Sequence, residues 1–130
     1  MRASRSSRLG IAALALGLLG AAACDSSQPK PAGAGAVPQE VQAGEAKFNA
    51  HCSACHGRQA AGTQQGPPLV HKIYEPNHHG DAAFLRAAEF GVKAHHWEFG
   101  NMPKIEGVSP GDVEQITGYV RWLQRQAGIS

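Results

Sequence analysis

The stretch CSACH, residues 52–56, brings two thiols and an imidazole together and constrains this chain more than any other feature. Three kinds of site use such a spacing: a redox dithiol, one half of a zinc site, and the attachment site of a c-type haem. A redox dithiol requires alternating strands and helices, which the sequence lacks, and a zinc site requires a second cysteine pair, which is also absent. The histidine directly after the second cysteine favours haem attachment.

The attachment motif assigns a separate task to each of its three side chains. Cys52 and Cys55 would form thioether bonds to the porphyrin, and their spacing of three on a helical turn places both sulfur atoms on one face. His56 would supply its imidazole as an axial ligand of the iron. The sequence therefore predicts one haem c, held covalently through Cys52 and Cys55.

Methionine is the expected second axial ligand, because a thioether favours ferrous iron and raises the reduction potential. The sequence has two methionines, and Met1 would leave with an export signal. Met102 remains, in the loop FGNMP, where Pro103 favours an extended backbone and Gly100 permits a turn. The alternative is a methionine that only fills the core, but a glycine- and proline-rich loop is a poor place for one. We therefore predict that His56 and Met102 both bind the iron.

Two aromatic residues, Trp97 and Phe99, precede Met102 in the same segment of the chain. Aromatic rings supply much buried apolar area. We expect both rings to form part of the wall of the haem pocket.

The first residues of the chain predict export. Arg2, Arg5 and Arg8 precede an apolar run, residues 9–23, that ends in three alanines. A basic start, a short apolar run and small residues are typical of an export signal. A transmembrane anchor is the weaker alternative, because about 20 apolar residues are needed to span a bilayer. Loss of the signal, residues 1–23, would change the formal net charge from +2 to about −1, and nothing indicates the basic patch of a nucleic-acid binder.

Cys24 follows the expected cleavage point directly. This arrangement resembles a bacterial lipoprotein signal, in which the cysteine carries a lipid that anchors the mature protein to the membrane surface. Ordinary cleavage, which would leave a soluble periplasmic protein, is the alternative, because Ala21 stands where such signals usually carry leucine. Residues 24–36 lack aromatic and large aliphatic side chains, and we predict that they form a flexible linker.

The folded domain is expected over residues 37–130, because all the aromatic residues lie between Phe48 and Trp122. A domain of this size has a marginal core. Its two long irregular segments, residues 57–80 and 91–108, require a large buried group to organise them. No strand pattern of useful length is present, so we predict an all-α fold around one haem, with long loops.

Local signals predict the first two of three helices. The first runs over residues 38–52, with Pro38 in its first turn. The second begins with Asp81 as its N-cap and stops at Gly91.

The third helix begins at Ser109, with Pro110 in its first turn and Asp112 as the acidic half of a capping box. Gly118 lies inside this helix and costs about 1 kcal/mol relative to alanine. Such a glycine suggests close approach of another backbone, and Gly44 of the first helix is the expected partner; the alternative is that both glycines are merely tolerated. The expected buried stripe consists of Val113, Ile116, Val120 and Leu123, with Tyr119 beside it.

Over most of the folded domain the chain resembles a small bacterial monohaem cytochrome c of class I, with histidine and methionine as iron ligands. This family places a glycine and an aromatic residue four apart on the N-terminal helix, ahead of the first haem cysteine, and Gly44, Phe48 and Cys52 match. It packs them against an aliphatic and an aromatic residue on the C-terminal helix, and Ile116 and Tyr119 match. The resemblance implies that the N- and C-terminal helices pack together.

The family also carries Gly-Pro-x-Leu after the attachment motif, and Gly66, Pro67 and Leu69 match this pattern. The resemblance implies that Pro67 and Leu69 lie at the haem. It also implies that the carbonyl oxygen of Pro67 accepts a hydrogen bond from the ring N–H of His56. Such a bond fixes the tautomer of the ligand and makes it more basic.

The resemblance implies an electron carrier rather than an enzyme, because both axial positions of the iron would be filled. Its partners would be redox proteins of the cell envelope, met in short encounters through interfaces below about 1,200 Å². We expect a monomer. Two alternatives stay open: a haem-based redox or gas sensor, which needs a labile or absent sixth ligand, and a copper-binding or assembly protein that uses the remaining histidines.

Two adjacent pairs among those histidines suggest a second metal site, because imidazole suits copper and zinc. Neighbouring histidines on an extended segment point in opposite directions, so each pair is expected to give one ligand. Exposed histidines, or histidines in contact with the haem propionates, are the favoured alternative. His95 and His96 could also displace Met102 if the loop opened. The histidines outside the attachment motif are His51, His71, His78, His79, His95 and His96.

Overall fold

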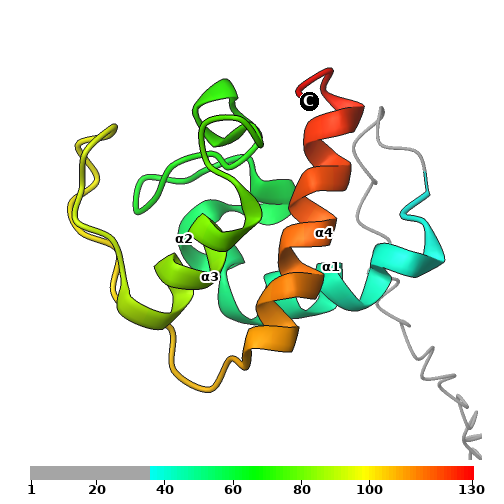
Figure 1. Ribbon diagram of the computed structural model, residues 1–130, viewed down its shortest axis with the longest axis horizontal. Helices are drawn as coiled ribbons and strands as arrows, with labels where there is room; N and C mark the ends of the chain where they lie inside the picture. The colour runs from blue at the N-terminus through cyan, green and yellow to red at the C-terminus, as the bar shows by residue number, and fades with distance from the viewer. Residues whose placement is uncertain (1–35) are drawn as a thin grey trace, which may run out of the picture. The chain divides into compact units, whose positions relative to one another are not determined.

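The structure is a computed structural model that describes residues 36–130. This part of the chain is helical and contains no β-strand, which confirms the predicted all-α class. The predicted export signal, Cys24 and all but the last residue of the predicted linker lie outside the described residues. No helix within residues 36–130 has the length and apolar character needed to cross a membrane. The helices, shown in Figure 1, are α1 (Gln39–His51), α2 (Ser53–His56), α3 (Asp81–Phe90) and α4 (Pro110–Gln126), with two 3₁₀ helices, η1 (Arg58–Ala60) and η2 (Lys72–Tyr74).

Helices α1 and α4 cross each other and make the most extensive contact between helices in the described chain. Gly44 of α1 lies directly against α4, where a Cβ atom would collide with the carbonyl oxygen of Gln115 and lie 3.0 Å from the Cβ of Tyr119. Phe48 packs on Tyr119 with ring centroids 5.7 Å apart. The predicted packing of the glycine–aromatic pair of α1 against α4 is therefore present.

Helix α4 begins at the predicted capping box. The backbone N–H of Asp112 donates to the hydroxyl of Ser109 at 3.2 Å, and the backbone N–H of Ser109 donates to the carboxylate of Asp112 at 3.0 Å. Pro110 is the first residue of the helix. The predicted stripe is buried, and the core that α4 helps to form consists of Phe48, Ala60, Leu69, Ile116, Tyr119, Val120, Trp122 and Leu123.

Three local predictions are wrong in detail. Gly118 is not the partner of Gly44, because no atom lies within 4 Å of a Cβ built at Gly118. Helix α1 approaches α4 three residues earlier, beside Gln115. Pro38 precedes α1 as its N-cap, and Asp81 is the first residue of α3, which Gly80 caps. The first-turn carboxylate of Asp81 still interacts favourably with the helix dipole.

The two glycines give a matched test of this packing. Gly44→Ala should lower the free energy of unfolding by about 1 to 3 kcal/mol, because the added methyl group would force the two helices apart. Gly118→Ala should raise it by about 0.5 to 1 kcal/mol, because it removes backbone entropy from a helix interior with open space around it. Chemical denaturation of the two variants measures both changes. Equal effects at the two positions would contradict this helix contact.

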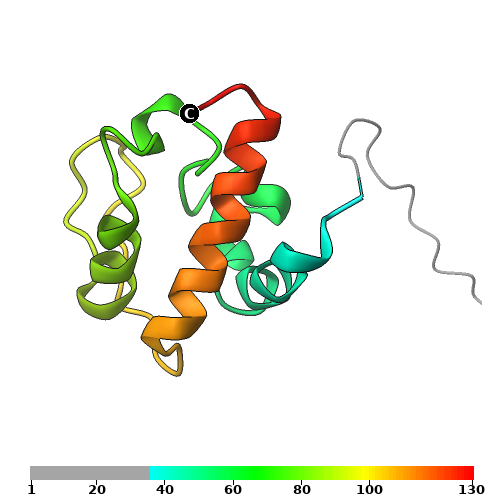
Figure 2. The same ribbon diagram turned by 45° about the vertical axis from the view of Figure 1, so that its right-hand side comes forward.

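The segment after α3 is a closed loop. Gly91, with φ of 76°, ends the helix as predicted. The backbone N–H groups of Val92 and Met102 then donate to each other's carbonyl oxygens at 2.9 and 3.0 Å. Residues 92–102 therefore form a loop that is joined at its base and lies beside α3 (Figure 2).

Candidate functional site

A large apolar pocket lies between α3, α4, the end of α1 and the long loops. Its volume is about 1070 Å³, counting the part that is open to solvent. Among its apolar lining residues are Phe48, Leu69, Phe84, Ala87, Val113 and Ile116. A concave space with mostly apolar walls and a few polar groups is typical of a binding site for an organic ligand.

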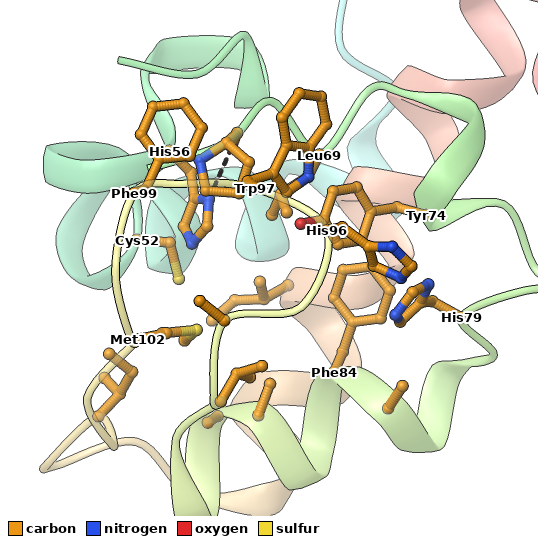
Figure 3. Close-up of a pocket in the computed structure, with 18 of the residues that line it drawn as sticks. Cys52, His56, Leu69, Tyr74, His79, Phe84, His96, Trp97, Phe99 and Met102 are labelled. Carbon is orange, nitrogen blue, oxygen red and sulfur yellow. Dashed lines mark hydrogen bonds between the residues drawn. The ribbon is translucent and has the colours of Figure 1, made fainter. Parts of the chain in front are cut away.

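Three predicted site residues from different segments meet in this pocket. Cys52 lies between α1 and α2, His56 ends α2, and Met102 closes the loop after α3; all three line the pocket. In Figure 3, His56 and Met102 extend into the pocket from different walls. Cys55 is exposed and is not among the lining residues.

The imidazole of His56 is held in one orientation. Its Nδ1–H donates to the carbonyl oxygen of Pro67 at 2.9 Å, the bond that the resemblance implied (Figure 3). Burial lowers the pKa of His56, and the bond to Pro67 opposes this effect. The ring is therefore neutral at pH 7, and the bond at Nδ1 leaves the Nε2 lone pair free to bind a metal ion.

The two cysteines are not joined by a disulfide. Burial, followed by the proximity of Cys55, raises the pKa of Cys52 to about 11. In the polypeptide alone Cys52 is thus a thiol at neutral pH. A thiol is the species required, because a thioether forms when the S–H group adds across a vinyl double bond.

The structure also brings the other predicted site residues to the pocket. Pro67 and Leu69 both line it, and Leu69 is 8% exposed and belongs to the core. Trp97 and Phe99 line it from the closed loop, with ring centroids 6.1 Å apart. Phe99 remains 39% exposed and so lies toward the mouth of the pocket.

One buried polar atom in the lining fits an acidic ligand group. The ring nitrogen Nε1 of Trp97 is buried and makes no hydrogen bond of ordinary geometry among the described residues. Tyr74 is its polar neighbour: burial raises the pKa of Tyr74, and the Trp97 side chain opposes this effect. A buried donor left unpaired costs about 1 to 3 kcal/mol. A haem carries two carboxylates, and either could accept this bond. The donor, the apolar walls and the cysteine–histidine motif together fit a haem in this pocket.

The expectation that adjacent histidines point in opposite directions is wrong for His78 and His79. Their ring centroids lie only 4.7 Å apart, because the backbone forms a turn in which both N–H groups donate to the carbonyl oxygen of Glu75. One ring nitrogen from each of His78, His79 and His96 lies within 4.8 Å of the others.

Three further histidines take no part in this cluster. His95 lines the pocket next to it, and its ring centroid lies 4.3 Å from that of His96, so the expectation of opposite directions is wrong for this pair too. His51 is exposed at the end of α1. His71 packs against the ring of Trp97, with centroids 5.1 Å apart, and its Nδ1 accepts a hydrogen bond from the backbone N–H of Ile73.

Arg121 is a structural residue that no sequence pattern singled out. It lies on α4 and is 7% exposed. Its guanidinium donates to the carboxylate of Asp81 at 2.8 Å, to the side-chain oxygen of Gln124 at 2.7 Å and to the carbonyl oxygens of Tyr74 and His79. The sequence signal that could have revealed it is a single charge inside the apolar stretch YVRWL, residues 119–123.

Comparison with known proteins agrees with the fold and the pocket. The chain matches the sequence model of the family described as cytochrome c over residues 41–124, more than half of its length. A comparison with curated proteins gave no match. The matched region contains the attachment motif, so a c-type haem is held covalently through Cys52 and Cys55, as predicted. The chain therefore belongs to the cytochrome c family and is a small, all-α cytochrome c.

Proposed function

We propose that this protein carries electrons through a haem whose iron is bound by His56 and Met102. Cytochromes c are haem-based electron carriers in general, and the iron supplies the chemistry by alternating between its ferric and ferrous states. The observation that carries the axial assignment is that Cys52, His56 and Met102 all line one apolar pocket. With both axial positions occupied by protein ligands, no place remains for a substrate, so we propose that the protein is not an enzyme.

The surrounding backbone supports both proposed ligands. Pro67 orients His56 through the bond at Nδ1, which directs the opposite ring nitrogen into the pocket. Met102 is paired with Val92 through two backbone hydrogen bonds, so the loop that carries the thioether is anchored next to the end of α3. Anchoring is important because a thioether is a weak ligand, and a mobile loop would leave the iron exposed to other ligands.

Electron exchange requires redox partner proteins, as it does for cytochromes c generally. We propose that these partners belong to the bacterial cell envelope and dock briefly on a monomer at the exposed edge of the haem. Transient redox complexes bury less than about 1,200 Å². The exposed side chain of Cys55 supports this location, because it indicates that the attachment edge of the pocket lies near the surface.

We also propose export and attachment to the membrane surface through a lipid on Cys24. The support is the basic and apolar N-terminal sequence that ends in alanines before this cysteine. A lipid anchor would keep the domain at a high effective concentration near membrane redox proteins. The intact mass of the mature protein tests this: a mature chain that lacks the lipid, or that does not begin at Cys24, contradicts the anchor.

The axial assignment is tested by Met102→Ala in the haem-loaded protein. The ferric form should lose the weak red absorption band that thioether–iron bonding produces. The reduction potential should fall by on the order of 0.1 V, within the range of about 0.8 V that axial ligands set, because the ferrous state loses its soft ligand. Optical spectra and a redox titration measure both changes. Ile105→Ala is the control, because it removes another pocket residue of the segment after α3 and leaves the sulfur in place. An unchanged spectrum and potential in Met102→Ala would contradict the assignment.

A further inference from the structure

Three imidazoles gather at the edge of the haem pocket, two of which, His79 and His96, also line it, and none has a task in haem attachment or in the proposed iron ligation. His78 and His79 lie in the turn before α3, and His96 lies in the closed loop 92–102. Their ring nitrogens, one from each, lie within 4.8 Å of one another. Figure 3 shows the rings of His79 and His96 next to each other, with ring centroids 5.2 Å apart. We propose that His78, His79 and His96, the trihistidine site, bind a divalent transition-metal cation, and that Cu²⁺ binds most tightly.

His79 already has the hydrogen bond that a metal-binding histidine usually makes. Its Nδ1–H donates to the carbonyl oxygen of Ile73 at 2.6 Å. This bond fixes the tautomer and leaves the lone pair of Nε2 available. Histidines that bind metals almost always donate their other ring N–H to a carbonyl or carboxylate, which orients the ring and makes it more basic.

The position of His79 is also fixed from inside the protein. The buried guanidinium of Arg121 donates to the backbone carbonyls of Tyr74 and His79, at the two ends of the turn. The turn is thus attached to α4 through a side chain that is itself 7% exposed. A site built on such a support loses little entropy when the metal binds.

The neighbouring imidazole rings disfavour protonation of His96. No ion pair within residues 36–130 involves a histidine. Partial desolvation, followed by the neighbouring rings of His95, His79 and His78, lowers the pKa of His96. Neutral imidazoles are the form that binds metals. Protonation of all three rings would place three positive charges close together, and these charges would repel one another. A single metal ion would instead be bound by all three neutral rings.

The number and type of donors indicate which cation fits. Imidazole nitrogen suits copper, zinc and nickel, and affinities for a given site rise to a maximum at Cu²⁺. Three histidine ligands leave a fourth position open for water. Bonds of about 2.0 to 2.1 Å would bring the donor atoms to about 3.3 Å from one another. His78 and His96 are exposed, and neither side chain makes a hydrogen bond to another described residue, so both can rotate inward.

Titration of the ferric, haem-loaded protein with CuSO₄ tests the site. We expect one tightly bound Cu²⁺ per chain by calorimetry, with a Cu²⁺ electron paramagnetic resonance spectrum that shows coupling to several nitrogen nuclei. The variant His78→Ala/His96→Ala should bind Cu²⁺ at least about 100-fold more weakly than the unmodified protein. Loss of a residue that only supports a metal ligand costs up to about 100-fold in affinity, and this variant lacks two of the ligands themselves. ZnCl₂ should compete for the same site.

His51→Ala is the matched control, because it removes an exposed histidine on α1 and leaves the cluster intact. It should bind Cu²⁺ as the unmodified protein does. Both altered residues of the double variant are exposed, and its haem absorbance and circular dichroism report whether the fold is retained. Absence of one-to-one binding, or equal affinities in the unmodified protein and the double variant, would overturn the proposal. The copper measurements do not depend on Met102, so they can fail or succeed independently of the proposed iron ligation.

Discussion

Replacing both Cys52 and Cys55 with alanine should abolish covalent haem binding and leave the domain without its native fold. The pocket walls are apolar, and the described domain is too small to offset their exposure to water with a core of its own. Without its attached group, the chain should form at most a compact state with loose side-chain packing. Haem staining after denaturing electrophoresis measures attachment, and near-ultraviolet circular dichroism measures the loss of packing.

The third cysteine of the sequence supplies the control for this experiment. Cys24→Ser removes a thiol outside the attachment motif, so this variant should keep its covalent haem and its fold. Covalent haem in the double variant, or near-native packing in its absence, would contradict the dependence of the fold on attachment. Loss of haem from Cys24→Ser would show that the motif is not the sole attachment point.

Features that depend on neighbouring residues could be predicted from the sequence. The capping box of α4 requires only Ser109, Pro110 and Asp112 in the right order, and all three act within a single helical turn. The stop at Gly91 depends on one positive φ angle. The attachment motif is local in the same sense, since its spacing alone defines how the thiols and the imidazole are presented.

Features that depend on how elements meet could not be predicted in the same way. Helical periodicity identifies the buried face of α4, but it does not determine where along that face another helix crosses. The crossing therefore lies at Gln115 rather than at Gly118. The prediction that neighbouring histidines point in opposite directions was wrong for a related reason. It assumes an extended backbone, whereas His78 and His79 lie in a turn.

Arg121 could not be predicted as a structural residue, because three of the four groups that accept its hydrogen bonds lie 40 or more residues away in the sequence. Two of them are backbone carbonyls of an irregular segment, which no residue pattern identifies. The same guanidinium lies over the ring of Phe84, 4.9 Å from its centroid. One buried side chain therefore joins α4 to the turn before α3 and to α3 itself.

Arg121→Met should lower the free energy of unfolding of the haem-loaded protein by about 1 to 3 kcal/mol, the cost of leaving a buried polar group without its hydrogen-bond partner. Methionine can fill much of the space, but the carbonyls of Tyr74 and His79 and the side chain of Gln124 would lose a donor that they share inside the protein. Denaturation by urea, followed by circular dichroism, measures the change. Arg125→Met is the control, because this arginine is exposed on the same helix and its replacement should change stability by less than about 0.5 kcal/mol. Similar effects in the two variants would mean that the turn before α3 is held by its own backbone hydrogen bonds and not by Arg121.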